Sequence, residues 1–248
     1  MGLAIKIGYP KNTASKAYLD TVKSCAIFRE SGVAEFVSAM AAGWKAQLIV
    51  ETWSRGGAIT TSIGLAVARA HAGGRHVCIV PDEESRSEYE RMVSSTSAAA
   101  ATEIVVGEAE EAMEDLAGVD FLVVDCRRKD FWRVLRVAKL SGKGGVLVCK
   151  NADSRTASRF RWRSVVEDQE EEGSSPSPSP SSSSSLSSSL SSRRVVRSVF
   201  LPVGKGLEIA HVSAAGGNSV AAAGKGRSGK RWIKHFDQRS GELHVIRR

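Results

Sequence analysis

The sequence predicts an α/β fold: a doubly wound, Rossmann-like sheet of five parallel strands covered by helices, followed by an antiparallel hairpin. Short apolar runs of strand length alternate with segments whose apolar residues recur at helical spacing. Near the end, two β-type runs are joined only by Pro202–Gly206, which is too short for a parallel crossover. The 248 residues, 42% hydrophobic and 25% charged, suffice for one such domain with extensions.

The clearest βαβ unit lies between residues 46 and 81. Ala46–Glu51 is a mostly apolar strand, Ala58–Ala72 carries apolar residues at helical spacing, and Arg75–Val80 is a second strand. Gly73 follows the last periodic residue and stops the helix. The loop Thr52–Gly57 is polar and contains glycine, so its backbone N–H groups and the positive helix end can face a nucleotide-like ligand.

The remaining elements continue the alternation on both sides of this unit. The patterns predict helices at Thr13–Glu30 and Val33–Trp44, a helix starting at Asp82, a strand at Glu103–Val106, a helix at Glu108–Leu116, a strand at Val119–Asp125, a helix at Lys129–Leu140, a strand at Val146–Cys149, and hairpin strands at Val195–Leu201 and Leu207–Val212.

The chain divides into a domain at residues 1–213, a linker at 214–229 and a basic tail at 230–248. A serine-rich stretch, Ser174–Ser192, contains fourteen Ser, three Pro and two Leu. It cannot bury enough apolar surface to order itself, so we expect a disordered insertion at 170–193. Lys225–Arg248 holds eight basic and two acidic residues, so most of the net charge of +8 belongs to the tail.

Composition narrows the class of protein further. Cys25, Cys78, Cys126 and Cys149 form no CxxC pair, which favours reduced thiols in an intracellular, cytoplasmic or nuclear protein. No apolar run reaches transmembrane length, so we expect no membrane partner. Aromatic residues make up only 6% of the chain, which disfavours nucleic-acid binding by base stacking. The histidines show no metal-ligand spacing.

Several motifs in a fixed order resemble the S-adenosylmethionine-dependent methyltransferase superfamily, and within it the metal-dependent catechol-type O-methyltransferases. An ordered set is more specific than any one motif. The segments that carry the resemblance are Glu51–Gly57, Gly74–Asp82, Val106–Ala109, Val123–Lys129, Gly144–Asn151 and Leu201–Leu207.

More narrowly, the chain is identified as a member of a plant family of unknown function, domain-of-unknown-function family 1442. The residues that carry this likeness are Thr13–Cys25, Val33–Trp44, Leu48–Gly56 and Lys230–Glu242. That family has no settled activity, so the resemblance implies a fold rather than a reaction.

The resemblance also implies a cofactor site, from which the sequence departs. Trp53 stands where the loop has a glycine that lets backbone approach the cofactor. Val80 stands where an acid binds the ribose hydroxyls, and valine accepts no hydrogen bond. Asp82, two residues later, either substitutes for that acid or caps its helix.

The implied Mg²⁺ site is altered as well. Asp125 and Asn151 match two of the family's three ligands, but Lys150 replaces the second Asp. An ammonium 4 Å from a divalent cation costs about 8 kcal/mol at an effective dielectric of about 20. We therefore expect no metal. Asp125 is read equally as a structural cap or an active-site residue, and Lys129 and Lys150 as solvated lysines.

The leading functional prediction is a degenerate, non-catalytic Rossmann module that binds a nucleotide, small molecule or partner. Its crevice residues would be Glu51, Trp53, Ser54, Gly56, Gly57, Asp82, Asp125 and Asn151. The alternative is an active, metal-independent methyltransferase with S-adenosylmethionine as cofactor, working mainly by alignment. A third reading is nucleic-acid or acidic-partner binding through the tail.

Overall fold

The computed structural model describes residues 13–28, 32–94, 101–152, 162–166, 193–213, 232–236 and 243–247. The chain forms two compact units, Met1–Gly217 and Asn218–Arg248. The predicted serine-rich insertion and the predicted linker lie outside the described residues. In the second unit, β10 (Trp232–Phe236) and β11 (Leu243–Arg247) pair as an antiparallel hairpin. Binding of nucleic acid by this basic tail stays a prediction.

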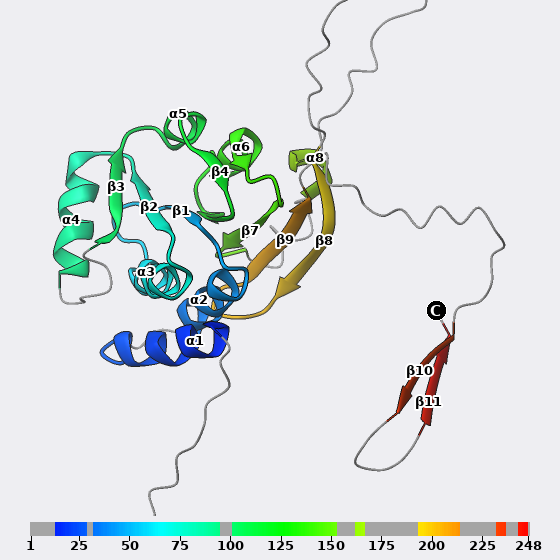
Figure 1. Ribbon diagram of the computed structural model, residues 1–248. Coiled ribbons are helices and arrows are strands. Elements are labelled where there is room, and N and C mark those ends of the chain that lie inside the picture. Colours follow the sequence, from blue (N-terminus) through cyan, green and yellow to red (C-terminus); the bar gives the residue numbers. More distant parts are fainter. Residues whose placement is uncertain are drawn as a thin grey trace, which may run out of the picture. The chain divides into compact units, whose positions relative to one another are not determined.

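The first unit is built on a seven-stranded sheet in the order β3-β2-β1-β5-β7-β9-β8 (Figure 1). Five strands are parallel and the last two pair antiparallel, which confirms the predicted fold class. The bounds are β1 Leu48–Thr52, β2 Arg75–Val80, β3 Glu103–Val106, β5 Phe121–Asp125, β7 Gly145–Lys150, β8 Arg194–Leu201 and β9 Leu207–Ser213.

Helices cover both faces of this sheet (Figure 1). One apolar core joins the sheet to α1, α2 and α3, and another joins the opposite face to α5, α6 and α8. In β1, Ile49 faces the first core and Val50 the second, as strand alternation requires. The bounds are α1 Thr13–Ser24, α2 Val33–Gly43, α3 Thr60–Ala72, α4 Glu83–Val93, α5 Ala109–Glu114, α6 Phe131–Val137 and α8 Trp162–Val166.

The predicted strand at Val119–Asp125 is present as β5, but its predicted start was wrong. The structure has β4 (Ala117–Val119) and β5, separated at Asp120. The buried carboxylate of Asp120 accepts hydrogen bonds from the backbone N–H groups of Gln47 (2.6 Å) and Leu48 (3.2 Å). Asp120 therefore fixes the start of β1, and this tertiary role interrupts a strand that looks continuous in sequence.

The predicted helix at Lys129–Leu140 is also shorter in the structure. It comprises only α6, and Lys139–Leu140 forms β6, which pairs with β4. The guanidinium of Arg193 donates hydrogen bonds to the carbonyl groups of Ala138 and Arg136, both at 2.6 Å. These contacts satisfy carbonyls at the helix end, where the backbone turns into an extended conformation.

Two other helices are shorter than predicted: α1 stops at Ser24 and is followed by turns, and α5 has only 6 residues. Within the described part of the chain, no helix is long and apolar enough to span a bilayer.

Candidate functional site

The predicted site residues gather at the carboxyl edge of the parallel strands, on both sides of the point where the strand order reverses. There, β1 lies between β2 and β5, and the chain has crossed from one half of the sheet to the other. Such a switch point opens a crevice that binds ligands in doubly wound sheets. Asp125 at the end of β5 lies opposite Lys150 at the end of β7 in the strand register.

A cavity of about 570 Å³ lies at this edge. The loop after β1, the start of α3, the end of β7 and the β8–β9 turn form its walls. Of the predicted residues, Gly56, Gly57 and Asn151 line it; Glu51, Trp53, Ser54, Asp82 and Asp125 are not among its lining residues. The lining consists of Val33, Gly56, Gly57, Ala58, Thr60, Thr61, Arg127, Lys150, Asn151, Gly204, Lys205, Gly206 and Leu207.

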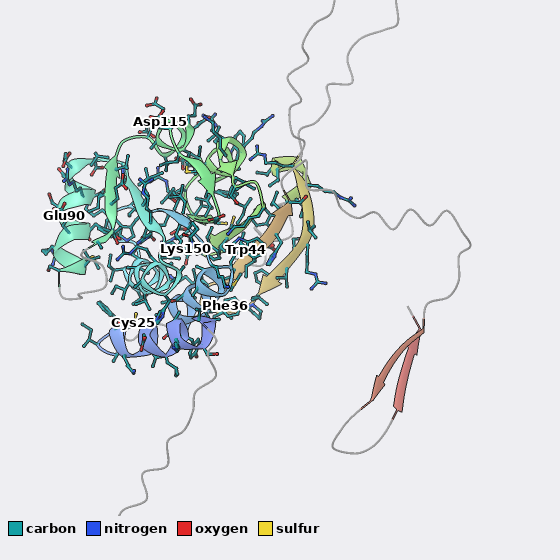
Figure 2. All side chains as sticks on the ribbon, viewed as in Figure 1. Cys25, Phe36, Trp44, Glu90, Asp115 and Lys150 are labelled. Atoms are coloured by element: carbon teal, nitrogen blue, oxygen red, sulfur yellow. The ribbon has the colours of Figure 1, made fainter. Side chains whose placement is uncertain are left out.

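Lys150 lies in the wall of this cavity and is only 5% exposed, so its expected solvation was wrong. Figure 2 shows it in the interior of the domain, in contrast to Glu90 and Asp115 at the periphery. It is the last residue of β7, which lies between β5 and β9 in the sheet. Its Nζ has no hydrogen-bond partner among the described residues. Lys129, by contrast, is exposed as expected.

Glu51 is fully buried at the end of β1, beside the cavity but inside the protein. Its Oε1 lies 3.2 Å from Nε2 of His76 and 3.4 Å from the Tyr89 hydroxyl, which donates to it. Nδ1 of His76 lies 3.0 Å from the hydroxyl of Thr102. Glu51 is therefore part of an internal polar cluster that joins β1, β2 and α4.

The electrostatics of this cluster favour an ionised Glu51. Burial raises the pKa of the carboxyl, but His76 and the charge of Lys150 outweigh burial and hold the pKa below its ordinary value. Burial, aided by the negative charge of Glu51, raises the pKa values of Cys78 and Tyr89 well above their usual range. These two groups remain protonated at neutral pH.

Sequence reasoning missed His76 and Tyr89 as partners of Glu51. The available signal was weak: Glu51 is paired with Cys78, and His76 lies two residues earlier on the same strand face. Only the parallel register between β1 and β2 brings these residues together.

Trp53 is packed into the protein at the start of the loop after β1. Its side chain is 2% exposed and contacts the ring of Tyr89 edge-on, with centroids 5.4 Å apart. It belongs to one apolar cluster with Val80 and Ile59. A Cβ added to Gly57 would lie 3.0 Å from the indole Nε1, so only glycine leaves room for the indole there. The indole therefore occupies the space between the loop and the end of β2.

Asp125 is engaged on several sides. It accepts hydrogen bonds from the Arg127 guanidinium at 2.7 Å, the Arg127 backbone N–H at 2.9 Å and the Asn151 amide at 2.8 Å. Burial raises its pKa, but these bonds and the charge of Lys150 outweigh burial and lower it. Asp130, rather than Asp125, is the residue that precedes α6.

The residues at the ends of β5 and β7 do not fit the magnesium site that the resemblance implies. Mg²⁺ requires several oxygen ligands in near-octahedral geometry. Here the Asp125 carboxylate is occupied by Arg127, and Lys150 supplies a cation in place of a ligand. The described residues also contain no cluster of three or more His, Cys, Asp or Glu suited to a metal ion.

Asp82 caps α4, which is one of the two roles predicted for it; the other was to replace the acid that binds the ribose. Its Oδ1 accepts a hydrogen bond from the backbone N–H of Ser85 at 2.7 Å. This bond, together with the nearby backbone, lowers the pKa of the Asp82 carboxyl. Val80, two residues earlier, is completely buried.

Comparison with known proteins identifies the family of the chain. A family model described as a protein of unknown function, DUF1442, matches residues 5–172 and 173–248. The chain belongs to the DUF1442 family. No curated protein sequence matches it.

Solved structures similar to this DUF1442 protein include methyltransferases. A methyltransferase from Geobacter sulfurreducens has 17% identity and a TM-score of 0.51, over 83% of this chain and 91% of its own. The methyltransferase PaMTH1 from Podospora anserina, solved with S-adenosylhomocysteine bound, has 12% identity and a TM-score of 0.51, over 82% and 88%. At this level of identity the likeness shows a methyltransferase-like fold.

Proposed function

We propose that this DUF1442 protein is a non-catalytic binding module, which uses a methyltransferase fold to hold a small molecule at the carboxyl edge of its sheet. In this proposal it does not bind S-adenosylmethionine in the manner of the enzymes it resembles. The observation that carries the proposal is the burial of the Trp53 indole in one apolar cluster with Val80.

The Trp53–Val80 packing removes two requirements of the cofactor site. The indole fills the space into which a glycine loop would admit the adenosine. Valine cannot accept the two ribose hydroxyl bonds, and hydrogen bonds to a charged group are each worth about 1.5–3 kcal/mol. The loss of both corresponds to a Kd at least about a hundredfold weaker. Asp82 does not restore the acceptor, because its carboxylate caps α4.

The remaining cavity supports a binding role. Its volume of about 570 Å³ lies within the range of small-molecule sites, about 300–1,000 Å³. It is lined by the backbone of Gly56 and Gly57, the start of α3 and the Asn151 amide, so it offers a few convergent polar groups. The neighbouring acids are engaged: Glu51 with His76, and Asp125 with Arg127.

Calorimetric titration with S-adenosylmethionine and S-adenosylhomocysteine tests this function. We expect no saturable heat from the full chain at ligand concentrations that saturate a control methyltransferase known to bind S-adenosylmethionine. A micromolar Kd for either compound would overturn the proposal. Methyl transfer in addition would establish the alternative, a metal-independent methyltransferase. Repeating the titration with Lys150→Met would then report whether that ligand reaches the cavity beside β7.

A further inference from the structure

We infer that the cavity binds the phosphate group of a small phosphorylated molecule, with Lys150 as its central contact; this inference rests on the proposed binding function. It starts from the burial of Lys150. A buried ammonium is costly unless an anion and hydrogen-bond acceptors surround it. Lys150 is 5% exposed, and its Nζ has no hydrogen-bond partner and no ion pair among the described residues.

The two nearest acids leave Lys150 without a direct partner. The charge of Lys150 lowers the pKa values of Glu51 and Asp125, so its ammonium lies within electrostatic reach of both. However, neither acid forms an ion pair or hydrogen bond with Nζ among the described residues: Oε1 of Glu51 lies 3.2 Å from His76 and accepts from Tyr89, Oε2 of Glu51 has no hydrogen-bond partner, and both oxygens of Asp125 accept from Arg127. The Nζ of Lys150 is therefore available to a ligand in the cavity whose wall it forms.

The helix α3 provides a second anion contact on the same cavity. Its first residues, Thr60 and Thr61, line the cavity, so the positive end of a 13-residue helix faces it. The N-cap residue is Ile59, whose side chain makes no capping hydrogen bond. Ile59 itself therefore supplies no acceptor to the N–H groups of Thr61 and Ser62, where Ser, Thr, Asp or Asn would supply one. An anion from the cavity would take that place.

The rim of the cavity is positively charged, like Lys150 and the start of α3. Lys205, exposed in the β8–β9 turn, and Arg127 both line it, and none of its lining residues is acidic. Arg127 is held by Asp125, and Lys150 and Lys205 are the lining cations that form no ion pair with any described residue. Donors therefore approach from the wall, from the helix end and from the rim. A tetrahedral phosphate can accept from three directions, whereas a planar carboxylate presents its oxygens in one plane.

The size of the cavity indicates that phosphate is one part of the ligand. The volume of about 570 Å³ far exceeds that of a single phosphate, whose oxygens would occupy only the end near Lys150 and α3. Gly56, Ala58, Val33 and Leu207 provide backbone and apolar surface for an organic group of modest size. We therefore assign the site to a phosphate monoester rather than to the free ion.

Thermal unfolding of the full chain in the presence of inorganic phosphate tests the assignment. Chloride at equal ionic strength is the reference, and malonate tests whether a carboxylate binds instead of phosphate. We expect a saturable rise in Tm with phosphate, about 5–10 °C at a hundred times the Kd. Lys150→Met should weaken phosphate binding by about thirtyfold or more. Lys16→Met, which removes the same charge from exposed α1, should bind phosphate like the wild type.

A second readout distinguishes a ligand contact from a structural lysine. In chloride alone, Lys150→Met should be close to the wild type in stability, because removal of a buried ammonium offsets the lost attraction to Glu51 and Asp125. A large loss of Tm in chloride would overturn the inference, and so would the absence of a saturable phosphate effect or an equal effect in Lys150→Met. Saturable binding of malonate but not phosphate would overturn only the phosphate assignment. The proposed function fails by a different result, the binding of S-adenosylmethionine.

Discussion

Replacement of Trp53 by alanine should strongly destabilise the first unit. The indole is 2% exposed, so nearly all of its surface leaves water on folding. A buried aromatic side chain covers about 150–250 Å², worth about 4–6 kcal/mol at about 25 cal/mol per Å². Measured Trp→Ala substitutions in protein cores cost about 3–5 kcal/mol. We therefore expect a loss of about 4 kcal/mol in the free energy of unfolding.

Trp132 provides a matched control for this experiment. It lies on α6, is 38% exposed, and has the guanidinium of Arg133 at 5.2 Å from its ring. Trp132→Ala should cost less than half as much as Trp53→Ala in urea unfolding followed by circular dichroism. A cost below about 1 kcal/mol for Trp53→Ala, or equal costs at both sites, would refute the claim that the indole is a core element.

The same variant carries a functional prediction. Trp53→Ala opens space beside the loop, but Val80 still offers no acceptor to ribose hydroxyls. We expect no measurable S-adenosylmethionine binding in calorimetry after this single change. Micromolar binding by Trp53→Ala would mean that the indole alone excludes the cofactor, and the weight given to Val80 would be wrong.

Two other positions give sharp expectations. The lowered pKa of Glu51 means that its ionised form stabilises the fold above its ordinary value of 4.5, and that this stabilisation is lost as pH falls through the lower folded pKa. Glu51→Gln should therefore lower the free energy of unfolding by about 1–3 kcal/mol at neutral pH, because it weakens the buried contact with His76. In acid unfolding, the difference in stability between the variant and the wild type should disappear below about pH 4. A difference that does not change with pH would contradict this expectation. Gly206 has φ +95°, and a Cβ there would lie 1.9 Å from the carbonyl oxygen of Ala152. Gly206→Ala should lower the free energy of unfolding by about 2–4 kcal/mol, whereas Gly142→Ala, with open space around it, should be nearly neutral; equal Tm values for the two would exclude the close approach.

Local patterns predicted most of the sheet, because its central strands are apolar on both faces and therefore continuous in sequence. β2 and β3 match their predicted bounds, and β1 begins two residues and ends one residue later than predicted. The errors occur where a distant residue decides the local structure. Asp120 breaks a strand because it binds the backbone of Gln47, 73 residues away. Arg193 ends α6 from 55 residues away, at Ala138.

The candidate site was predicted in position better than in detail. The predicted strand ends placed Gly57, Asn151 and Asp125 at the carboxyl edge of the sheet, where the structure has them, and Gly57 and Asn151 line the cavity. The burial of Lys150 was not predicted, because lysines are usually solvated and the tertiary packing that buries this one is not visible in the local sequence. The partners of Glu51 were also missed, since hydrogen bonds between strands depend on a register that sequence periodicity does not specify.

Two departures from the methyltransferase pattern act on different parts of the crevice. Trp53 fills the space near β2, where an adenosine would lie, without changing any charge. Lys150 is the last residue of β7 and carries an ammonium where the resemblance implies a carboxylate, a difference of two charge units. The first substitution alone would leave a site that still attracts cations, and the second alone would leave room for a nucleoside. Under the proposed function, we expect the two substitutions together to leave a smaller crevice that binds an anion rather than the metal-bound diol that the resemblance implies.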